Sequence, residues 1–298
     1  MKRLSVLAML WIFSGAALAA RDFSDVEISV QDLGGGIYML KGSGGNMGVS
    51  SGEDGLYIID DQFAPLTRKI TEALSEISPQ PVRFVINTHW HGDHTGGNEN
   101  FGKAGAVIVA HDNVFRRLST DQQRGEGRVT EAAPDAALPA VTFNEQMTLH
   151  LNGDDMRVFH VANAHTDGDA IVHFRAHNVL HMGDTFFNGG YPFIDVGSGG
   201  GIDGYIAALD QGLALADART RIIPGHGELS DKAQMTAYRD MLKKIRGRIA
   251  GLKQAGKSLE EVTAAAPTAE FDAEFGQGWI GPERIVEAIY TSLPMQPE

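Results

Sequence analysis

The feature that most limits how this chain can fold is a cluster of histidines in the segment Thr88–Gly97. The segment reads Thr-His-Trp-His-Gly-Asp-His-Thr-Gly-Gly and follows a β-branched stretch, residues 82–87, that predicts a strand. An extended backbone points His89 and His91 the same way, and Gly92 then allows the chain to turn. Imidazole nitrogens and carboxylate oxygens are ligands of zinc. The segment therefore predicts a metal site, with these ligands: His89, His91, Asp93 and His94.

Four side chains cannot complete the shells of two metal ions, so further ligands have to come from elsewhere in the chain. Three later segments each follow a predicted strand and contain a glycine. Loops at the ends of strands on a rigid sheet commonly carry site residues. The three segments supply a histidine, an aspartate and a histidine: Ala164–Asp169 with His165, His181–Thr185 with Asp184, and Pro224–Gly227 with His226.

The sequence of 298 residues contains no cysteine, which excludes thiolate ligands, thiol nucleophiles and disulfides. Any metal site must therefore be built from histidines and carboxylates.

The N-terminus has the pattern of a secretory signal peptide. Lys2 and Arg3 precede an apolar run, residues 4–13, and Ala17-Leu18-Ala19 matches a cleavage site. We expect residues 1–19 to be removed and residues 20–298 to form a single domain, located in the periplasm or secreted. No later stretch reaches the ~20 apolar residues of a membrane-spanning helix, so we expect no membrane insertion after cleavage.

The charge balance argues against nucleic acid as a partner. The whole chain has a formal net charge of −13, from 25 basic and 38 acidic residues, and loss of Lys2 and Arg3 with the leader gives 23 − 38 = −15. Such a polyanion repels phosphate backbones. A small-molecule substrate is the expected partner.

Hydrophobic periodicity predicts a mixed α/β fold. The predicted strands are residues 26–30, 36–41, 46–50, 56–60, 82–87, 107–110, 147–151, 156–160, 170–174, 179–182 and 220–223. The predicted helices are residues 67–77, 202–215, 230–255, 259–265 and 282–293. Residues 119–139 are polar, which predicts an excursion of the chain along the surface that covers a functional site.

The order and content of these motifs, from His89 to His226, resemble the metallo-β-lactamase superfamily over almost the whole mature chain. The resemblance implies a four-layer αβ/βα sandwich with its metal site between the two sheets, at one edge. It also implies two zinc ions and a role for each candidate ligand. One ion would be held by His89, His91 and His165, the other by Asp93, His94 and His226, and Asp184 would bridge the two.

The resemblance implies hydrolysis of a carbonyl-type bond by a zinc-bound hydroxide, since zinc lowers the pKa of its bound water to roughly 7. Asp93 would be catalytic as well as a ligand, because it would orient that nucleophile. Export together with this resemblance suggests β-lactam hydrolysis. No organic cofactor is implied.

Two features favour other bonds. Asp184 stands where one β-lactamase subclass has a cysteine ligand, which resembles the thioester, lactone and phosphodiester hydrolases of the superfamily, including glyoxalase II. No lysine or arginine occurs between Arg175 and Arg219, where many β-lactamases place a lysine that binds the substrate carboxylate. The loop 188–191 offers weaker donors, and Arg124 and Arg128 could replace the lysine.

Two alternatives share the same residues. A persulfide dioxygenase of this fold would use one iron ion, and a metal-binding partner of a periplasmic oxidoreductase would have no activity of its own.

The remaining histidines lack a ligand-like context and are predicted to be structural: His111, His150, His160, His173, His177 and His181. Asp167 and Asp169 are candidates to accept the second N–H of a ligand histidine. Trp90 should point away from its neighbours His89 and His91 and pack in the core.

Overall fold

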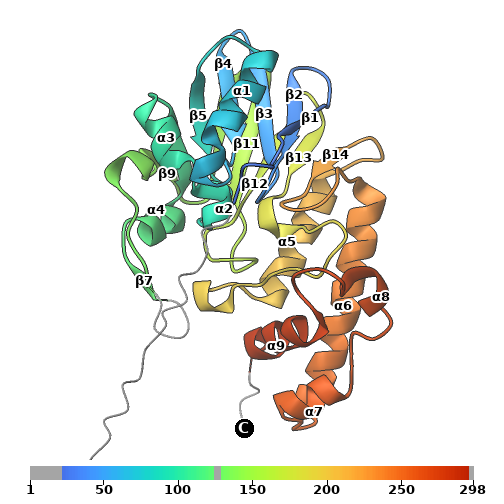
Figure 1. Ribbon diagram of the computed structural model, residues 1–298. Helices are drawn as coiled ribbons and strands as arrows, with labels where there is room; N and C mark the ends of the chain where they lie inside the picture. Colours follow the sequence, from blue (N-terminus) through green and yellow to red (C-terminus); the bar gives the residue numbers. More distant parts are fainter. Residues whose placement is uncertain (1–21, 124–128, 295–298) are drawn as a thin grey trace, which may run out of the picture.

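The structure is a computed structural model that describes residues 22–123 and 129–294. The predicted leader, residues 1–19, lies outside these residues, and so do Arg124 and Arg128. Figure 1 shows the described chain as two packed sheets with helices outside them.

The first sheet has seven strands in the order β1-β2-β3-β4-β5-β6-β9. The strands β1 to β4 pair antiparallel, whereas β4, β5, β6 and β9 pair parallel. Their bounds are β1 Ser29–Asp32, β2 Ile37–Lys41, β3 Met47–Gly52, β4 Gly55–Ile59, β5 Val82–Ile86, β6 Val107–His111 and β9 Val141–Phe143.

The second sheet has five strands in the order β10-β11-β12-β13-β14. All neighbours are antiparallel except β13 and β14, which run parallel. The strands are β10 Gln146–Leu151, β11 Asp154–His160, β12 Ala170–Phe174, β13 Val179–His181 and β14 Arg221–Ile223.

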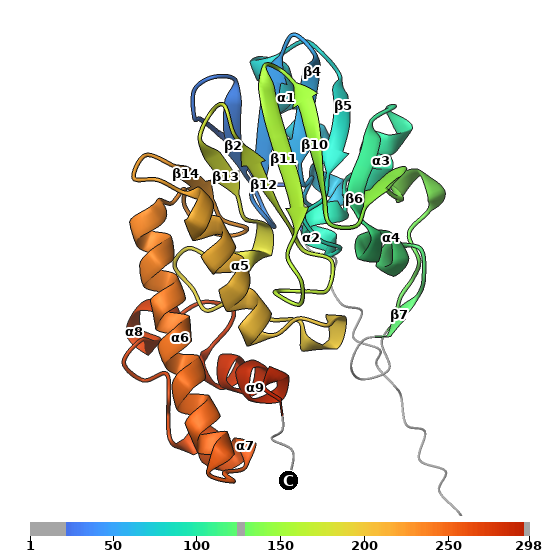
Figure 2. The ribbon, with the colours of Figure 1, turned by 180° about the vertical axis from the view of Figure 1, so that it is seen from behind.

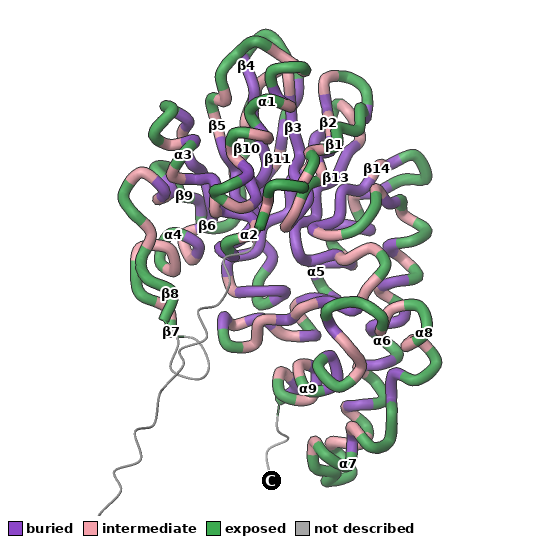
Figure 3. Tube along the Cα trace, in the orientation of Figure 1, coloured by how far each residue is buried: buried purple, intermediate pink, exposed green. Residues whose placement is uncertain are grey.

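Buried side chains define four layers. A central cluster, including Ile59 and Ile86 of the first sheet and Val158 and Val172 of the second, fills the space between the sheets. A second cluster joins the outer face of the first sheet to α1 (Thr67–Ile77) and α3 (Asn98–Lys103). The largest cluster joins the second sheet to the C-terminal helices α5 (Ile202–Leu215), α6 (Lys232–Gln254), α7 (Leu259–Ala264) and α9 (Pro282–Ser292). Figures 2 and 3 show these helices and the buried interior they enclose, and the layering confirms the predicted sandwich.

The predicted helices and strands recur with ends shifted by a few residues. Helix α1 has the predicted bounds because Ile70 and Leu74 form one buried stripe. The predicted strand 26–30 is wrong in part, since β1 covers Ser29–Asp32 and is exposed throughout.

Short elements were not predicted, because periodicity needs more residues than they contain. They are α2 (Gly92–Thr95), α3, α4 (Asp112–Leu118), α8 (Asp272–Phe275) and β9. The excursion 119–139 contains β7 (Gln122–Gln123) and β8 (Val129–Thr130), which pair with each other. Among the helices of the described residues, none has both the length and the apolar character needed to cross a bilayer.

Candidate metal site

The seven predicted ligands come from loops at one edge of the two sheets. His89 and His91 lie just after β5, and Asp93 and His94 lie on the short helix α2 that follows. His165 lies between β11 and β12. Asp184 and His226 lie just beyond β13 and β14, which are neighbours in the second sheet. The strands therefore deliver all seven side chains to the same end of the sandwich.

The seven side chains form two groups that could each hold a metal ion, and in each group the ligand atoms lie within 4.8 Å of one another. The first group is His89, His91, His165 and Asp184, and the second is Asp93, His94 and His226.

Asp184 faces both groups. Its Oδ2 lies 3.4 Å from Nε2 of His165 and 3.4 Å from Nε2 of His226, and its Oδ1 lies 3.1 Å from Nε2 of His94. This is the position that a bridging carboxylate requires. The structure therefore brings together every residue of the predicted set, in the predicted grouping.

Three imidazole nitrogens of the first group face one another. Nδ1 of His91 lies 3.1 Å from Nε2 of His89 and 2.8 Å from Nε2 of His165. The other nitrogen of His91 lies 2.9 Å from Asp195 Oδ2, and the other nitrogen of His165 lies 2.6 Å from the carbonyl oxygen of Phe193. A carboxylate and a carbonyl can only accept, so these outer nitrogens carry the protons.

His89 is oriented in the same way. Its Nδ1 lies 3.1 Å from the hydroxyl oxygen of Thr88, whose own proton is donated to Asp60. Thr88 must therefore accept the proton of Nδ1. Burial lowers the pKa of His89 well below its ordinary value and that of His165 to about 4, so both rings are neutral at pH 7. Nε2 of His89 and Nε2 of His165 thus present their lone pairs to Nδ1 of His91, so the three nitrogens converge on one point, as the ligands of one metal ion do.

The second group has more negative surroundings. Burial alone would lower the pKa of His94, but Asp184, Asp93 and Asp60 outweigh it and raise that pKa well above its ordinary value. Burial would raise the pKa of Asp184, and the four surrounding histidines instead hold it well below its usual range. The surroundings therefore favour positive charge beside Nε2 of His94, which a bound divalent cation supplies.

The buried atoms of the described residues that make no well-aligned hydrogen bond include two of this site, Nε2 of His94 and Oδ1 of Asp184, which lie 3.1 Å apart. Buried polar atoms of this kind are rare unless a ligand completes them. The residues therefore fit a pair of metal ions. That these seven side chains bind metal stays a prediction.

Two carboxylates that orient candidate ligand histidines were not predicted from the sequence. Asp195 accepts from Nε2 of His91, and Asp60 Oδ2 accepts from Nδ1 of His94 at 2.8 Å. Burial would raise the pKa of Asp195, but hydrogen bonds from His91 and Ser198 lower it below its usual range, so it is an anion. Metal-binding histidines commonly donate their second N–H to such a group.

The prediction that Asp167 and Asp169 accept ligand N–H groups is wrong. Asp169 accepts from the N–H and the hydroxyl of Thr166, at 2.7 and 2.6 Å. Asp167 binds the guanidinium of Arg117 through both oxygens, each at 2.7 Å. Both aspartates shape the loop of His165 and do not contact its ring nitrogens.

Trp90 is buried against Ala110 and Val114, as predicted. The guanidinium of Arg117 lies 5.6 Å from the centre of its ring. Arg117 thus joins the loop of Trp90 to the loop of Asp167, which carries His165.

The remaining histidines lie outside both groups. His111 and His160 stack with ring centres 3.8 Å apart, and His111 caps α4 by accepting the N–H of Asn113. His150 pairs with Asp155 on the surface. Buried His181 lies 3.2 Å from the carbonyl oxygen of Asn46. Their structural roles agree with the prediction.

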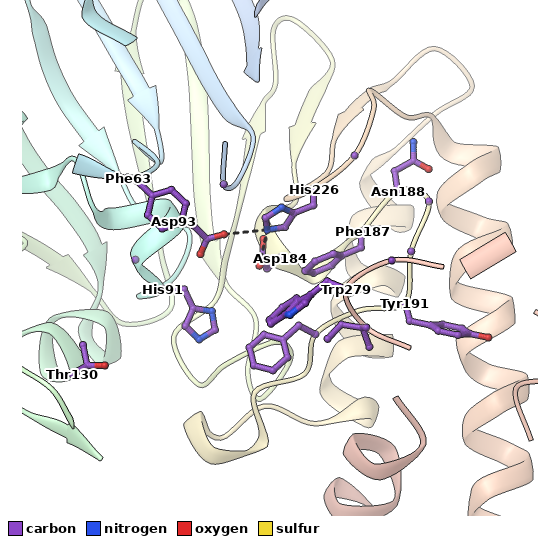
Figure 4. Close-up of a pocket in the computed structure, with 18 of the residues that line it drawn as sticks. Phe63, His91, Asp93, Thr130, Asp184, Phe187, Asn188, Tyr191, His226 and Trp279 are labelled. Carbon is purple, nitrogen blue, oxygen red and sulfur yellow. Dashed lines mark ion pairs between the residues drawn. The ribbon is translucent and has the colours of Figure 1, made fainter. Parts of the chain in front are cut away.

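An open cleft of about 1010 Å³ adjoins the two groups. Figure 4 shows Asp93, Asp184 and His226 beside it, together with several aromatic side chains. Val129 and Thr130, from the polar excursion, also line the cleft, as predicted for a segment over a site.

Comparison with known proteins gives one family and distant relatives. A family model described as the metallo-beta-lactamase superfamily matches residues 43–227. A hydroxyacylglutathione hydrolase from Polaromonas sp. is 26% identical over 178 residues, which cover 59% of this chain and 60% of that protein. This chain therefore spans less than two thirds of that relative. A metallo-beta-lactamase type 2 from Bacillus cereus is 22% identical over 190 residues, covering 63% of this chain and 69% of that protein. Among solved structures, the stereoselective inverting sec-alkylsulfatase Pisa1 from Pseudomonas sp. has a TM-score of 0.68 at 17% identity, covering 89% of this chain and 50% of that one.

Proposed function

This chain belongs to the metallo-β-lactamase superfamily, and we propose that it is an exported hydrolase that uses two zinc ions to cleave a carbonyl-type bond. The observation that carries the proposal is the convergence of three imidazole nitrogens at 2.8 and 3.1 Å beside a carboxylate that faces a second ligand group. Nitrogen and carboxylate donors without a thiolate suit zinc. Asp184 faces both groups, which favours two ions over the single iron of a dioxygenase.

Zinc ions bound in this way would supply a hydroxide at neutral pH and polarise the carbonyl oxygen of a substrate. The residues around them have separate tasks. The side chains of Asp93 and His226 are 27% and 30% exposed, whereas that of His94 is fully buried. Asp93 thus reaches the cleft, where its free oxygen can accept a proton from the attacking water and fix its direction. The buried ligands are held by Asp195 and Asp60 and keep their orientation during the reaction.

Among carbonyl-type bonds, thioesters and lactones are favoured over β-lactams. Asp184 is a hard bridging ligand, and the cleft lacks a lysine or arginine among the described residues that line it. β-Lactam antibiotics carry a carboxylate that such a cation would bind. The name of the Polaromonas relative denotes hydrolysis of an acylglutathione, which is a thioester. β-Lactam opening is the second candidate, and the relative named a metallo-beta-lactamase supports it.

A hydrolysis panel on the zinc-loaded protein tests the proposal. Acyl thioesters and lactones should be hydrolysed faster than penicillins and carbapenems, with two zinc ions per chain and no oxygen consumption. His91→Ala removes the nitrogen on which the other two imidazoles of the first group converge, and should abolish turnover while the protein stays folded. His150→Ala is the matched control, since His150 is an exposed histidine outside both groups. Oxygen uptake with a persulfide would favour the dioxygenase. A folded protein inert to the whole panel would favour the binding role.

A further inference from the structure

Aromatic side chains form much of the wall of the cleft, and they begin at the predicted ligands. The ring of Phe193 stacks on His91 with centres 5.7 Å apart, and the ring of Phe187 stacks on His226 at 4.9 Å. Phe63, Trp279 and Ile280 continue this surface. Figure 4 shows Phe187 and Trp279 projecting into the space beside Asp184 and His226. A substrate whose carbonyl carbon reaches the ligands therefore places its substituent against these rings.

Trp279 is the most exposed of the large hydrophobic side chains described, at 68%. It is held in place: its ring centre lies 5.1 Å from that of Phe193, and the guanidinium of Arg284 lies 4.7 Å from its centre and donates to its backbone carbonyl at 3.2 Å. Leaving an indole in water forgoes the free energy of its burial. An apolar group bound in the cleft would cover the exposed face of the indole.

The described residues that line the cleft include the carboxylates of Asp93 and Asp184. Asp93 and Asp184 are candidate metal ligands, so bound zinc ions would compensate their charge. Away from the ligands, an anionic substituent would lie against aromatic rings, with no lysine or arginine among the described lining residues to pair with it, which costs free energy. A neutral substituent avoids this cost.

We propose that Trp279, Phe193 and Phe187 form a subsite for the neutral, apolar acyl group of the substrate, and that Trp279 sets the preference for its size. The substrate class is a thioester with a medium-chain or aryl acyl group, and water converts it to the acid and the free thiol. The volume of about 1010 Å³ accommodates a group of that size. Phe187 and Phe193 lie within residues 43–227, which the family model matches, whereas Trp279 lies outside them, so the C-terminal helical part of this chain supplies Trp279 to the subsite. The inference rests on the proposed hydrolase function.

A chain-length series tests the subsite. The zinc-loaded protein should hydrolyse N-acetylcysteamine thioesters from acetyl to octanoyl, and KM should fall about fourfold for each added methylene. Trp279→Ala should raise KM for the octanoyl thioester at least tenfold more than it raises KM for the acetyl thioester, and Trp279→Phe should restore most of the loss. Phe115→Ala, at an exposed aromatic residue of α4 outside the cleft, is the matched control and should change neither. The hexanoyl thioester should bind at least tenfold more tightly than its ω-carboxylate analogue.

Binding without turnover separates this inference from the proposed function. Residues 20–298 contain two tryptophans, buried Trp90 and exposed Trp279. Octanamide should shift the fluorescence emission of the wild-type protein to shorter wavelength, because its alkyl chain would cover the exposed indole, and should not shift that of Trp279→Phe. A KM independent of chain length, or equal binding of the neutral and the carboxylate thioester, would overturn the subsite even if acetyl thioester is hydrolysed. A chain-length-dependent emission shift with no hydrolysis of any thioester would keep the subsite and overturn the proposed function.

Discussion

Replacing Asp60 with asparagine should weaken the second metal position by changing the tautomer of His94. Asp60 is fully buried, and its carboxylate accepts three hydrogen bonds: Oδ1 from the N–H of Thr88, and Oδ2 from the hydroxyl of Thr88 and from Nδ1 of His94. In Asp60→Asn, the amide oxygen can take the place of Oδ1 and accept from the N–H of Thr88. The NH₂ group then faces Nδ1–H of His94. The opposite orientation sets NH₂ against the N–H of Thr88. One donor faces another in either case.

The conflict is relieved when Nδ1 of His94 carries no proton and Nε2 carries one. Nε2 is the atom that faces Asp184 at 3.1 Å. A protonated Nε2 cannot bind a metal ion. Loss of such an orienting partner costs about 10–100-fold in metal affinity, or about 1.4–2.7 kcal/mol. The backbone should tolerate the change, because Asp60 has a φ of 62° and asparagine adopts this left-handed conformation readily.

The assay is competition for zinc with a chromophoric chelator, which resolves the two dissociation constants. We expect the weaker constant to rise 10–100-fold and the tighter one to change less than threefold. Asp61→Asn is the matched control. Asp61 is equally buried, accepts from the N–H of Gly97, and has a pKa that burial raises well above its ordinary value, so its neutral form resembles asparagine. Both constants should then stay within threefold of the wild type. An Asp60→Asn protein that holds both zinc ions with wild-type affinity would refute the reasoning.

Three further predictions concern stability and processing. Arg117→Lys loses the paired hydrogen bonds to Asp167 and should lower the free energy of unfolding by about 1–2 kcal/mol in urea titrations; a change near zero would argue that the two loops are held by other contacts. Burial, together with His160, lowers the pKa of His111 to about 4, so its neutral ring contributes stability above pH 6.5 that is lost as the pH falls towards 4. The stability gap between the wild type and His111→Gln, measured in chelator, should therefore shrink from pH 7.5 to pH 5, and a constant gap would contradict this. Mass spectrometry of the exported protein should give an N-terminus at Ala20, and an intact Met1 would refute the leader.

The ligands were predictable because most of their signal is local. His89, His91, Asp93 and His94 stand within six positions, and the later ligands each follow a strand. The grouping into two shells came from the family resemblance, and the geometry agrees with it.

The contacts that orient the candidate ligands could not be predicted from local sequence patterns. Asp60 is 34 residues from His94, and Asp195 is 104 residues from His91. Neither stands in a recognisable pattern, and each becomes a partner only when two loops pack together. Asp167 and Asp169 are close to His165 in the sequence, but their carboxylates bind Arg117 and Thr166 instead. The aromatic wall was missed for the same reason, because Phe193 and Trp279 meet only after α9 has packed.

The parallel pairing of β13 with β14 also has a consequence for the order in which the candidate ligands come together. Every donor of the first group has been synthesised once the chain reaches Asp184, just beyond β13, whereas the second group lacks His226 until α5 has packed and β14 has docked. Under this ligand assignment, a partly folded chain could capture one cation before it could capture two. The connectivity of the fold would then set the order of loading, and docking of the last strand would complete the second group.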